Sequence, residues 1–371
     1  MLRLTKNVNG LNQQTTVKSM KNYSRLFLLH LIALFGVSIP SLAIDTNSSL
    51  KLQKGNFKIL LSKNEMEPVK LAAKTLCKDF EKVMHYKPEI FQNTDDTQQI
   101  DIVIINEAVD TPLFQSRFIR PLDGFESHRV YCSPEEKRIY LHGKDMRGAI
   151  YAIYTFSELF LGVPPLWYFC SWEPQYKKQV EIKSSFDYFK KSPQVRYRAW
   201  FPNDTDLFKP WRRLSKENDE LWLETMLRLK LNTVELEATV TYPDYKLNSQ
   251  AALLRKYGLI LTSHHHVACN NNLMNWAGYW RKVRGVEPPE LLLSNEKALI
   301  EFWQYSIETV CRNKQENLWQ IAFRGVNDQP FWAAFSDAPK DDKERADIIN
   351  RMIRIPVSYT HLRAHETKAN L

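Results

Sequence analysis

The sequence predicts an α/β protein with a small N-terminal α/β domain over residues 44–183, followed by the first half of a TIM (β/α)8 barrel over residues 195–355. Strand-like segments alternate with longer helix-like segments along the whole of this region, a pattern typical of parallel βαβ units. In the second part this unit of one strand followed by one helix recurs four times. A complete barrel needs eight units and about 250 residues, so the chain holds about half of one.

The N-terminal domain contains four predicted strands, at residues 57–61, 101–105, 128–132 and 138–141. Between the first two lies a predicted helix over 67–84, where Val69, Ala72, Leu76 and Phe80 recur at helical spacing. An apolar helix over 149–161 follows the last strand and ends at Gly162, just before two prolines. The polar residues 184–194 are the predicted linker.

The second part is predicted to begin with a strand at residues 196–201. Three further strands are expected, at 232–238, 259–263 and 319–324, and the helices between and after them at 218–230, 249–257, 295–311 and 340–353. A doubly wound sheet is the alternative. It is disfavoured because no G-x-G-x-x-G turn follows any of these strands.

Both ends of the chain are expected to lie outside the fold. Basic residues precede the apolar run 26–37, and Ser41-Leu42-Ala43 follows it, which is the layout of a signal peptide. Residues 1–43 are therefore a predicted leader, the mature protein begins near residue 44, and we expect a periplasmic or secreted protein without a membrane span. Residues 356–371 resemble a translated sequencing adapter, so we expect the native sequence to continue differently beyond residue 355.

The net charge of +9 does not indicate a nucleic-acid partner. The leader holds five of the basic residues and no acid, and the tail adds one net positive charge, which leaves +3 over residues 44–355. Nucleic-acid-binding domains concentrate positive charge on one face or stripe, and no long basic run occurs here. The oligomeric state cannot be predicted.

Ionisable and polar side chains follow each predicted strand of the second part. Because catalytic groups of a TIM barrel lie at the carboxyl ends of its strands, these residues predict an active site at one rim. They are Asn203 and Asp204, then Glu235 and Glu237, then His264, His265 and His266, then Arg324 and Asp328. Each could instead have a structural role, such as a turn residue or an ion pair.

Aromatic residues near the same strand ends indicate a sugar ligand. Trp200, Trp211, Trp276, Trp280, Trp332 and Tyr242 offer flat apolar faces that suit pyranose rings. Arg324 suits an anionic group, so an acidic sugar fits best. Packing in the core is the alternative for several of these rings.

The three consecutive histidines also invite a metal-site interpretation. No further histidine remains in the second part to complete a ligand set. We therefore expect no metal and no cofactor, with these histidines donating hydrogen bonds to a polar substrate. A metal-dependent hydrolase remains the less favoured alternative.

Five segments of the sequence carry a further signal: GKDMRGAIYAIYTFSELFLGVPPLWY (143–168), NDTD (203–206), RLKLNT (228–233), YGLILTSHHH (257–266) and FRGVNDQP (323–330). Together they resemble glycoside hydrolase family 115. The resemblance covers residues 52–355. It implies an inverting α-1,2-glucuronidase that removes (4-O-methyl)glucuronic acid from xylan-type polysaccharide, with a barrel after an N-terminal α/β domain.

The resemblance also implies roles for individual residues. Asp328 matches a catalytic carboxylate, and Arg324 an arginine that contacts the uronate. Asn203 and Asp204 match polar residues that bind the substrate, as do His264 and His265. The family's second carboxylate would lie beyond residue 355, so this chain alone is expected to be inactive.

Three positions depart from the family's pattern. Glu235 stands where a substrate-stacking tryptophan is expected, and is taken here as substrate-binding. His266 and Gln329 replace acidic residues. These departures leave the exact glycan open and favour, as the alternative, a non-catalytic carbohydrate-binding protein of the same fold.

Overall fold

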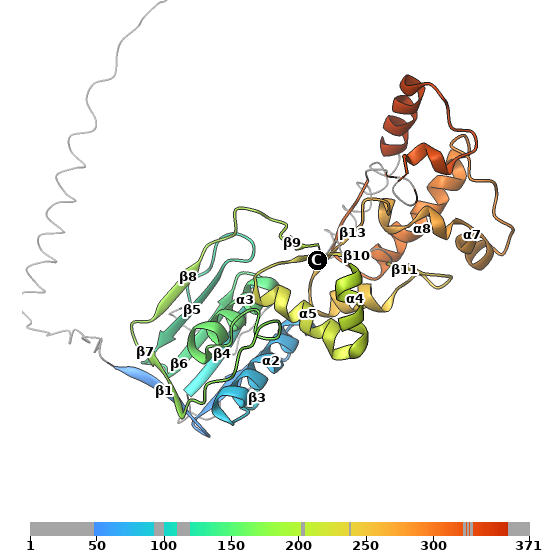
Figure 1. Cartoon of the computed structure of the whole chain (residues 1–371). Coiled ribbons are helices and arrows are strands. Elements are labelled where there is room, and N and C mark those ends of the chain that lie inside the picture. The colour runs from blue at the N-terminus through green and yellow to red at the C-terminus, as the bar shows by residue number, and fades with distance from the viewer. Residues whose placement is uncertain are drawn as a thin grey trace, which may run out of the picture. The chain divides into compact units, whose positions relative to one another are not determined.

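The computed structural model describes residues 48–92, 100–109, 119–201, 205–236, 239–321, 324, 326 and 329–354. Its first part is a six-stranded mixed sheet in the order β3-β2-β4-β6-β5-β8 (Figure 1). The strands are β2 (Phe57–Leu60), β3 (Ile90–Phe91), β4 (Ile100–Asn106), β5 (His128–Ser133), β6 (Arg138–Gly143) and β8 (Asp187–Lys190). The first four in the sheet order are parallel, and β5 and β8 add antiparallel pairs. None of the helices in the described ranges is both long and apolar enough to span a membrane.

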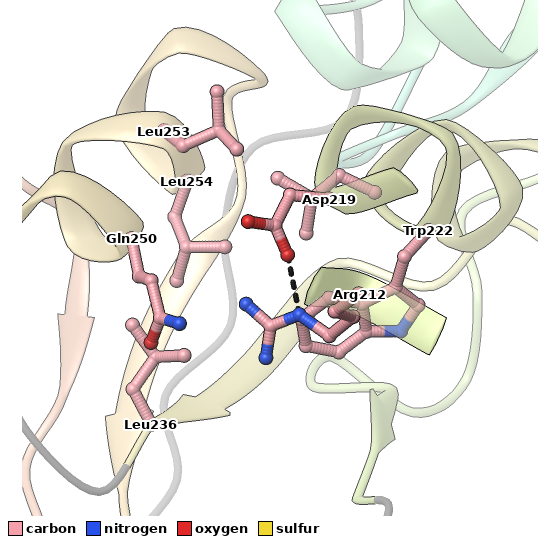
Figure 2. Close-up of a pocket in the computed structure, with 8 residues that line it drawn as sticks. Arg212, Asp219, Trp222, Leu236, Gln250, Leu253 and Leu254 are labelled. Atoms are coloured by element: carbon pink, nitrogen blue, oxygen red, sulfur yellow. Dashed lines mark hydrogen bonds and ion pairs between the residues drawn. The ribbon is translucent and has the colours of Figure 1, made fainter. Parts of the chain in front are cut away.

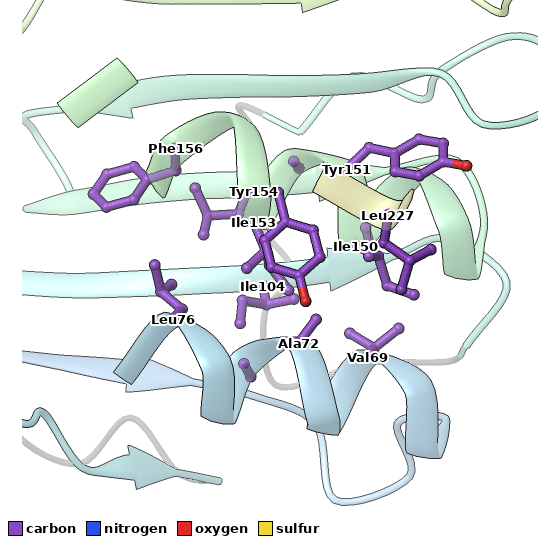
Figure 3. Close-up of a cluster of buried hydrophobic side chains, with 14 of the residues drawn as sticks. Val69, Ala72, Leu76, Ile104, Ile150, Tyr151, Ile153, Tyr154, Phe156 and Leu227 are labelled. Atoms are coloured by element: carbon purple, nitrogen blue, oxygen red, sulfur yellow. The ribbon is translucent and has the colours of Figure 1, made fainter. Parts of the chain in front are cut away.

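Two helices, α2 (Glu67–Met84) and α3 (Met146–Phe156), form the core of this part with the sheet. Figure 3 shows Val69, Ala72 and Leu76 of α2 facing Ile150 and other apolar side chains of α3. The predicted helix 67–84 matches α2 residue for residue. A π-helical turn, η2 (Ser157–Leu161), continues α3 to the left-handed Gly162.

The turn from β6 into α3 requires two glycines. A Cβ on Gly143 would lie 1.8 Å from the backbone nitrogen of Ala149, and one on Gly148 would lie 2.6 Å from the carbonyl oxygen of Ser127. Asp145 caps the helix, because its carboxylate accepts a hydrogen bond from the Gly148 amide at 2.8 Å. This close approach explains why the segment 143–148 reads GKDMRG.

The second part is built on a parallel sheet in the order β14-β13-β10-β9. Its strands are short: β9 (Ala199–Trp200), β10 (Thr233–Leu236), β13 (Ile260–Ser263) and β14 (Asn317–Leu318). The helices are α4 (Thr205–Leu214), α5 (Lys216–Arg228), α6 (Ser249–Lys256), α7 (Trp276–Tyr279), α8 (Glu296–Arg312) and a helical segment over 342–354. Each of these four strands pairs with the next of the four along the chain, as in a (β/α)8 barrel. The described residues contain no closed barrel, so the α/β architecture is established and the half-barrel is not.

Several segments differ from the sequence-based predictions. Residues 187–190, inside the predicted linker, form β8 and pair with β5. Two strands not predicted, β1 (Ser49–Gln53) and β7 (Gln179–Lys183), pair antiparallel, and β11 (Val240–Thr241) pairs with β12 (Lys246–Leu247). The fourth strand lies at Asn317–Leu318 instead of 319–324, of which 322 and 323 are outside the described residues. The predicted leader and tail are outside them as well.

Buried ion pairs and shared apolar packing join the two predicted domains. Arg228 of α5 donates to Asp79 of α2 at 2.6 Å, with the two side chains 1% and 0% exposed. Glu126, which precedes β5, pairs with Arg147 and Arg198 and accepts a hydrogen bond from the Asn232 amide. One hydrophobic cluster contains residues from both parts. The first domain therefore contacts the second sheet at the amino-terminal ends of β9 and β10.

Candidate active site

The alternation of side chains along β10 defines two faces of the second sheet. Val234 and Leu236 are buried in the cluster that includes residues of α5 and α6. Glu235 lies between them and points to the opposite face. In register with it on β13 stands Thr262. The face that carries Glu235 and Thr262 would be the interior of a barrel.

Glu235 and His264 form the best-defined contact at these strand ends. Nδ1 of His264 lies in hydrogen-bond contact with Oε1 of Glu235, and the side chains are 14% and 13% exposed. An ionised carboxylate only accepts hydrogen bonds, so Nδ1 is the donor. The ring of Phe201, just beyond β9, lies 5.2 Å from the ring of His264. Residues from the ends of three neighbouring strands therefore meet at one place.

The three histidines after β13 form a compact cluster. The ring centroid of His264 lies 3.8 Å from that of His265 and 4.6 Å from that of His266. All three side chains are partly exposed. The sequence placed His266 with His264 and His265 at the predicted rim, and also marked it as a departure from the family's pattern; the structure places it in the same cluster.

The other predicted site residues are placed only in part. Arg324 is exposed to solvent, but Phe323 and Gly325 beside it are not among the described residues. Asn203, Asp204, Glu237 and Asp328 also lie outside them, so their roles stay predictions. The structure thus brings together Glu235, His264 and His265 of the predicted set.

The aromatic residues predicted to contact sugar pack mainly against protein. Trp276 and Trp280 are buried, and their rings lie 5.5 Å apart in a T-shaped pair. Trp200 packs against the shared core, with its ring 6.0 Å from that of Phe208. Burial of large apolar surface stabilises the fold, and this accounts for these rings. Phe201, which was not predicted, is the exposed ring near the histidines.

A shallow pocket on the helix side of the second sheet is a separate feature (Figure 2). It is lined by Arg212, Asp219, Trp222, Leu223, Leu236, Gln250, Leu253 and Leu254. Leu236 points into it, so it lies on the opposite face of β10 from Glu235. The charges of Arg212 and Asp219 are paired with each other, which leaves no unsatisfied ionic group to recruit a charged ligand. We interpret it as a packing hollow between helices.

The geometry at the strand ends suits recognition of a polar, anionic ligand. Glu235 accepts a hydrogen bond from Nδ1 of His264 and so fixes the orientation of the imidazole ring. A histidine held in this way can donate a hydrogen bond to a hydroxyl or a carboxylate. An exposed guanidinium such as that of Arg324 binds carboxylates through two parallel hydrogen bonds.

Comparison with known proteins confirms the resemblance stated from the sequence. Residues 190–362 match the model of glycosyl hydrolase family 115. Among solved structures, a family GH115 4-O-methyl-α-glucuronidase, BtGH115A, with specificity for decorated arabinogalactans, superposes with a TM-score of 0.63 at 22% identity. The match covers 82% of this chain and 39% of that one, so the chain spans well under half of the glucuronidase. Together these matches show that the chain resembles this family and shares the fold of the glucuronidase over the matched part.

Other solved glycosidases are more distant. The chitobiase of Flavobacterium johnsoniae matches with a TM-score of 0.46 and 11% identity over 86% of this chain and 48% of its own. A β-hexosaminidase of Streptomyces plicatus matches with a TM-score of 0.41 and 12% identity over 72% and 54%. No curated protein matches the chain in sequence.

Proposed function

We propose that this chain, which resembles glycoside hydrolase family 115, carries the substrate-binding part of an α-glucuronidase. Its substrate would be a xylan-type polysaccharide with α-1,2-linked (4-O-methyl)glucuronic acid side chains. The observation that carries the proposal is the contact between Glu235 and His264 at adjacent strand ends, inside the region matched by the family model.

The anionic group of the sugar would be bound by positive side chains. His264, held in place by Glu235, and His265 beside it would donate hydrogen bonds to the uronate. Arg324 would pair with the same carboxylate, and Asn203 and Asp204 would bind hydroxyls. Glu235 would act on the sugar mainly through His264, because its Oε1 is already engaged by that ring.

Hydrolysis with inversion needs a carboxylic acid that protonates the leaving oxygen and a carboxylate that activates water on the other side of the ring. The two carboxyl groups stand about 6.5–9.5 Å apart to admit that water. We assign one of these roles to Asp328. The second carboxylate would come from a further strand of a (β/α)8 barrel whose first four strands are β9, β10, β13 and β14. Export, as indicated by the leader, would bring the enzyme to its polysaccharide.

Turnover of a uronic-acid-substituted xylo-oligosaccharide by a longer protein that includes the second carboxylate tests this proposal, because this chain alone is expected to be inactive. Release of free uronic acid is expected, and Asp328→Asn should lower the rate at least ~100-fold, the usual contribution of a general acid or base. Binding of the oligosaccharide without release of uronic acid would select the non-catalytic carbohydrate-binding alternative. Failure of both binding and release would contradict the proposal.

A further inference from the structure

We infer that His264, His265 and His266 form a binding site for a divalent transition-metal ion of the zinc class. Each of the three histidines offers one ring nitrogen, and these three nitrogens all lie within 4.8 Å of one another. Imidazole is a preferred ligand of zinc, copper and nickel. This inference goes beyond the proposed glucuronidase function and does not depend on it.

The distances lie close to those that a metal ion requires. Zinc–nitrogen bonds of about 2.0–2.1 Å in a tetrahedral site place the nitrogens roughly 3.4 Å apart. Closing the cluster from separations of up to 4.8 Å therefore requires ring rotations of the three side chains. Such rotations are possible because all three rings are partly exposed.

The number of ligands is sufficient. The sequence-based objection to a metal was that no fourth histidine is available. A zinc site with an open position takes only three protein ligands, and water or a ligand oxygen fills the fourth position. Three histidines on consecutive residues meet that requirement without any residue from outside the described part of the chain.

The contact between Glu235 and His264 is a second observation that favours a metal site. Histidines that bind metals commonly donate their other ring N–H to a carboxylate, which fixes the ring and makes the metal-bound nitrogen more basic. Glu235 accepts from Nδ1 of His264, so Nε2 is the atom that we assign to the ion. The largely buried carboxylate also adds a negative charge beside the cation. Phe201, with its ring 5.2 Å from that of His264, provides an apolar wall.

A bound ion would change what the site can recognise. Three neutral imidazoles and a divalent cation carry two positive charges, with one coordination position left for an oxygen ligand. A carboxylate is such a ligand. With an ion bound, the cluster would bind anions through the metal, and Nε2 of His264 would no longer donate a hydrogen bond to the ligand.

Isothermal titration of the protein with ZnCl2 tests the inference, and cobalt substitution provides a spectroscopic readout. We expect one zinc ion per chain with a Kd below ~10 μM, no competition from Mg²⁺, and the absorption bands of tetrahedral cobalt. His264→Ala and His266→Ala should each weaken binding at least tenfold. Glu235→Gln should weaken it ~10–100-fold, as removal of an outer partner does.

His85→Ala is the matched control, because His85 is exposed and stacks on Tyr176 away from this cluster. It should bind zinc like the parent protein. His266→Asn serves if the alanine variant does not fold, with folding followed by circular dichroism. Absence of saturable zinc binding by the parent protein, or zinc binding by His264→Ala and His266→Ala as tight as that of the parent, would overturn the inference. Neither readout involves a sugar, so failure here is distinct from failure of the proposed hydrolysis.

Discussion

Glu235, on β10, accepts a hydrogen bond from Nδ1 of His264, one residue beyond β13. The contact joins two strands that pair in parallel register and holds one imidazole of the histidine cluster in a single tautomer.

Replacing Glu235 by Gln should weaken binding of a uronic-acid oligosaccharide about 3–30-fold, because Nδ1 of His264 loses the carboxylate that holds the ring in place. The same substitution should leave the thermal midpoint nearly unchanged, since the amide preserves the shape of the side chain. A double-mutant cycle with His264→Gln, measured by titration calorimetry, checks the assignment. Additive effects of the two substitutions would show that the pair does not act as a unit.

The buried ion pair between Arg228 and Asp79 should be costly to break from one side only. Arg228→Met leaves the Asp79 carboxylate buried without its main partner and is expected to lower the free energy of unfolding by about 3–5 kcal/mol. The double variant Arg228→Met, Asp79→Leu should regain most of that loss, because neither charge remains. Urea denaturation of the parent, the single variant and the double variant gives the three free energies of unfolding to be compared. Equal losses in the single and double variants would mean that packing, not charge, determines the effect.

Gly143→Ala should prevent normal packing of α3 against the end of β6. The added Cβ would lie 1.8 Å from a backbone nitrogen, which only a backbone shift can relieve, so we expect a loss of more than about 3 kcal/mol. Gly278→Ala is the matched control, because nothing lies within 4 Å of its added Cβ. That substitution in α7 should be neutral or stabilising by up to about 1 kcal/mol. A Gly143→Ala protein as stable as the parent would show that the turn is wrongly placed.

Burial of His128 lowers its pKa from the ordinary 6.5 to about 4. Its Nδ1 donates to the carbonyl of Glu126, and its Nε2 accepts from Thr155, so the native ring is neutral. Above pH 6.5 the histidine is neutral in both the folded and the unfolded state, and its contribution to the free energy of unfolding is complete. Between pH 6.5 and 4 the unfolded chain takes up a proton that the folded protein excludes, so stability falls by up to about 3 kcal/mol.

The test of this pH dependence compares the parent protein with His128→Gln. Urea midpoints measured at pH 7 and pH 4.5 should differ less in the variant, whatever other groups titrate in that range. A parent and a variant with the same pH dependence would contradict the assignment of a neutral buried ring.

The strongly periodic elements of this fold were predictable, and the short or polar ones were not. Helix α2 was predicted residue for residue because its apolar positions recur at helical spacing. Strand β8 was missed because it is a mostly exposed edge strand, whose polar residues read as a linker. The fourth strand of the second sheet has two residues, too few for any periodicity.

For the site, the sequence predicted which strand ends carry chemistry but not how the side chains meet. The position of Glu235 and His264 on adjacent strands followed from the βαβ pattern, whereas their direct hydrogen bond depends on strand register. Burial of Trp276 and Trp280 could not be predicted, because a tryptophan near a strand end suits a core as well as a sugar.

Calorimetric binding of two oligosaccharides that differ only in a glucuronic acid side chain tests the central claim most directly. If the ends of β10 and β13 bind an acidic sugar, the protein should bind the acidic oligosaccharide at least ~10-fold more tightly than the neutral one, a difference of about 1.4 kcal/mol, and His264→Gln should remove most of that preference. Equal affinity for both oligosaccharides, or an unchanged preference in the variant, would contradict the account.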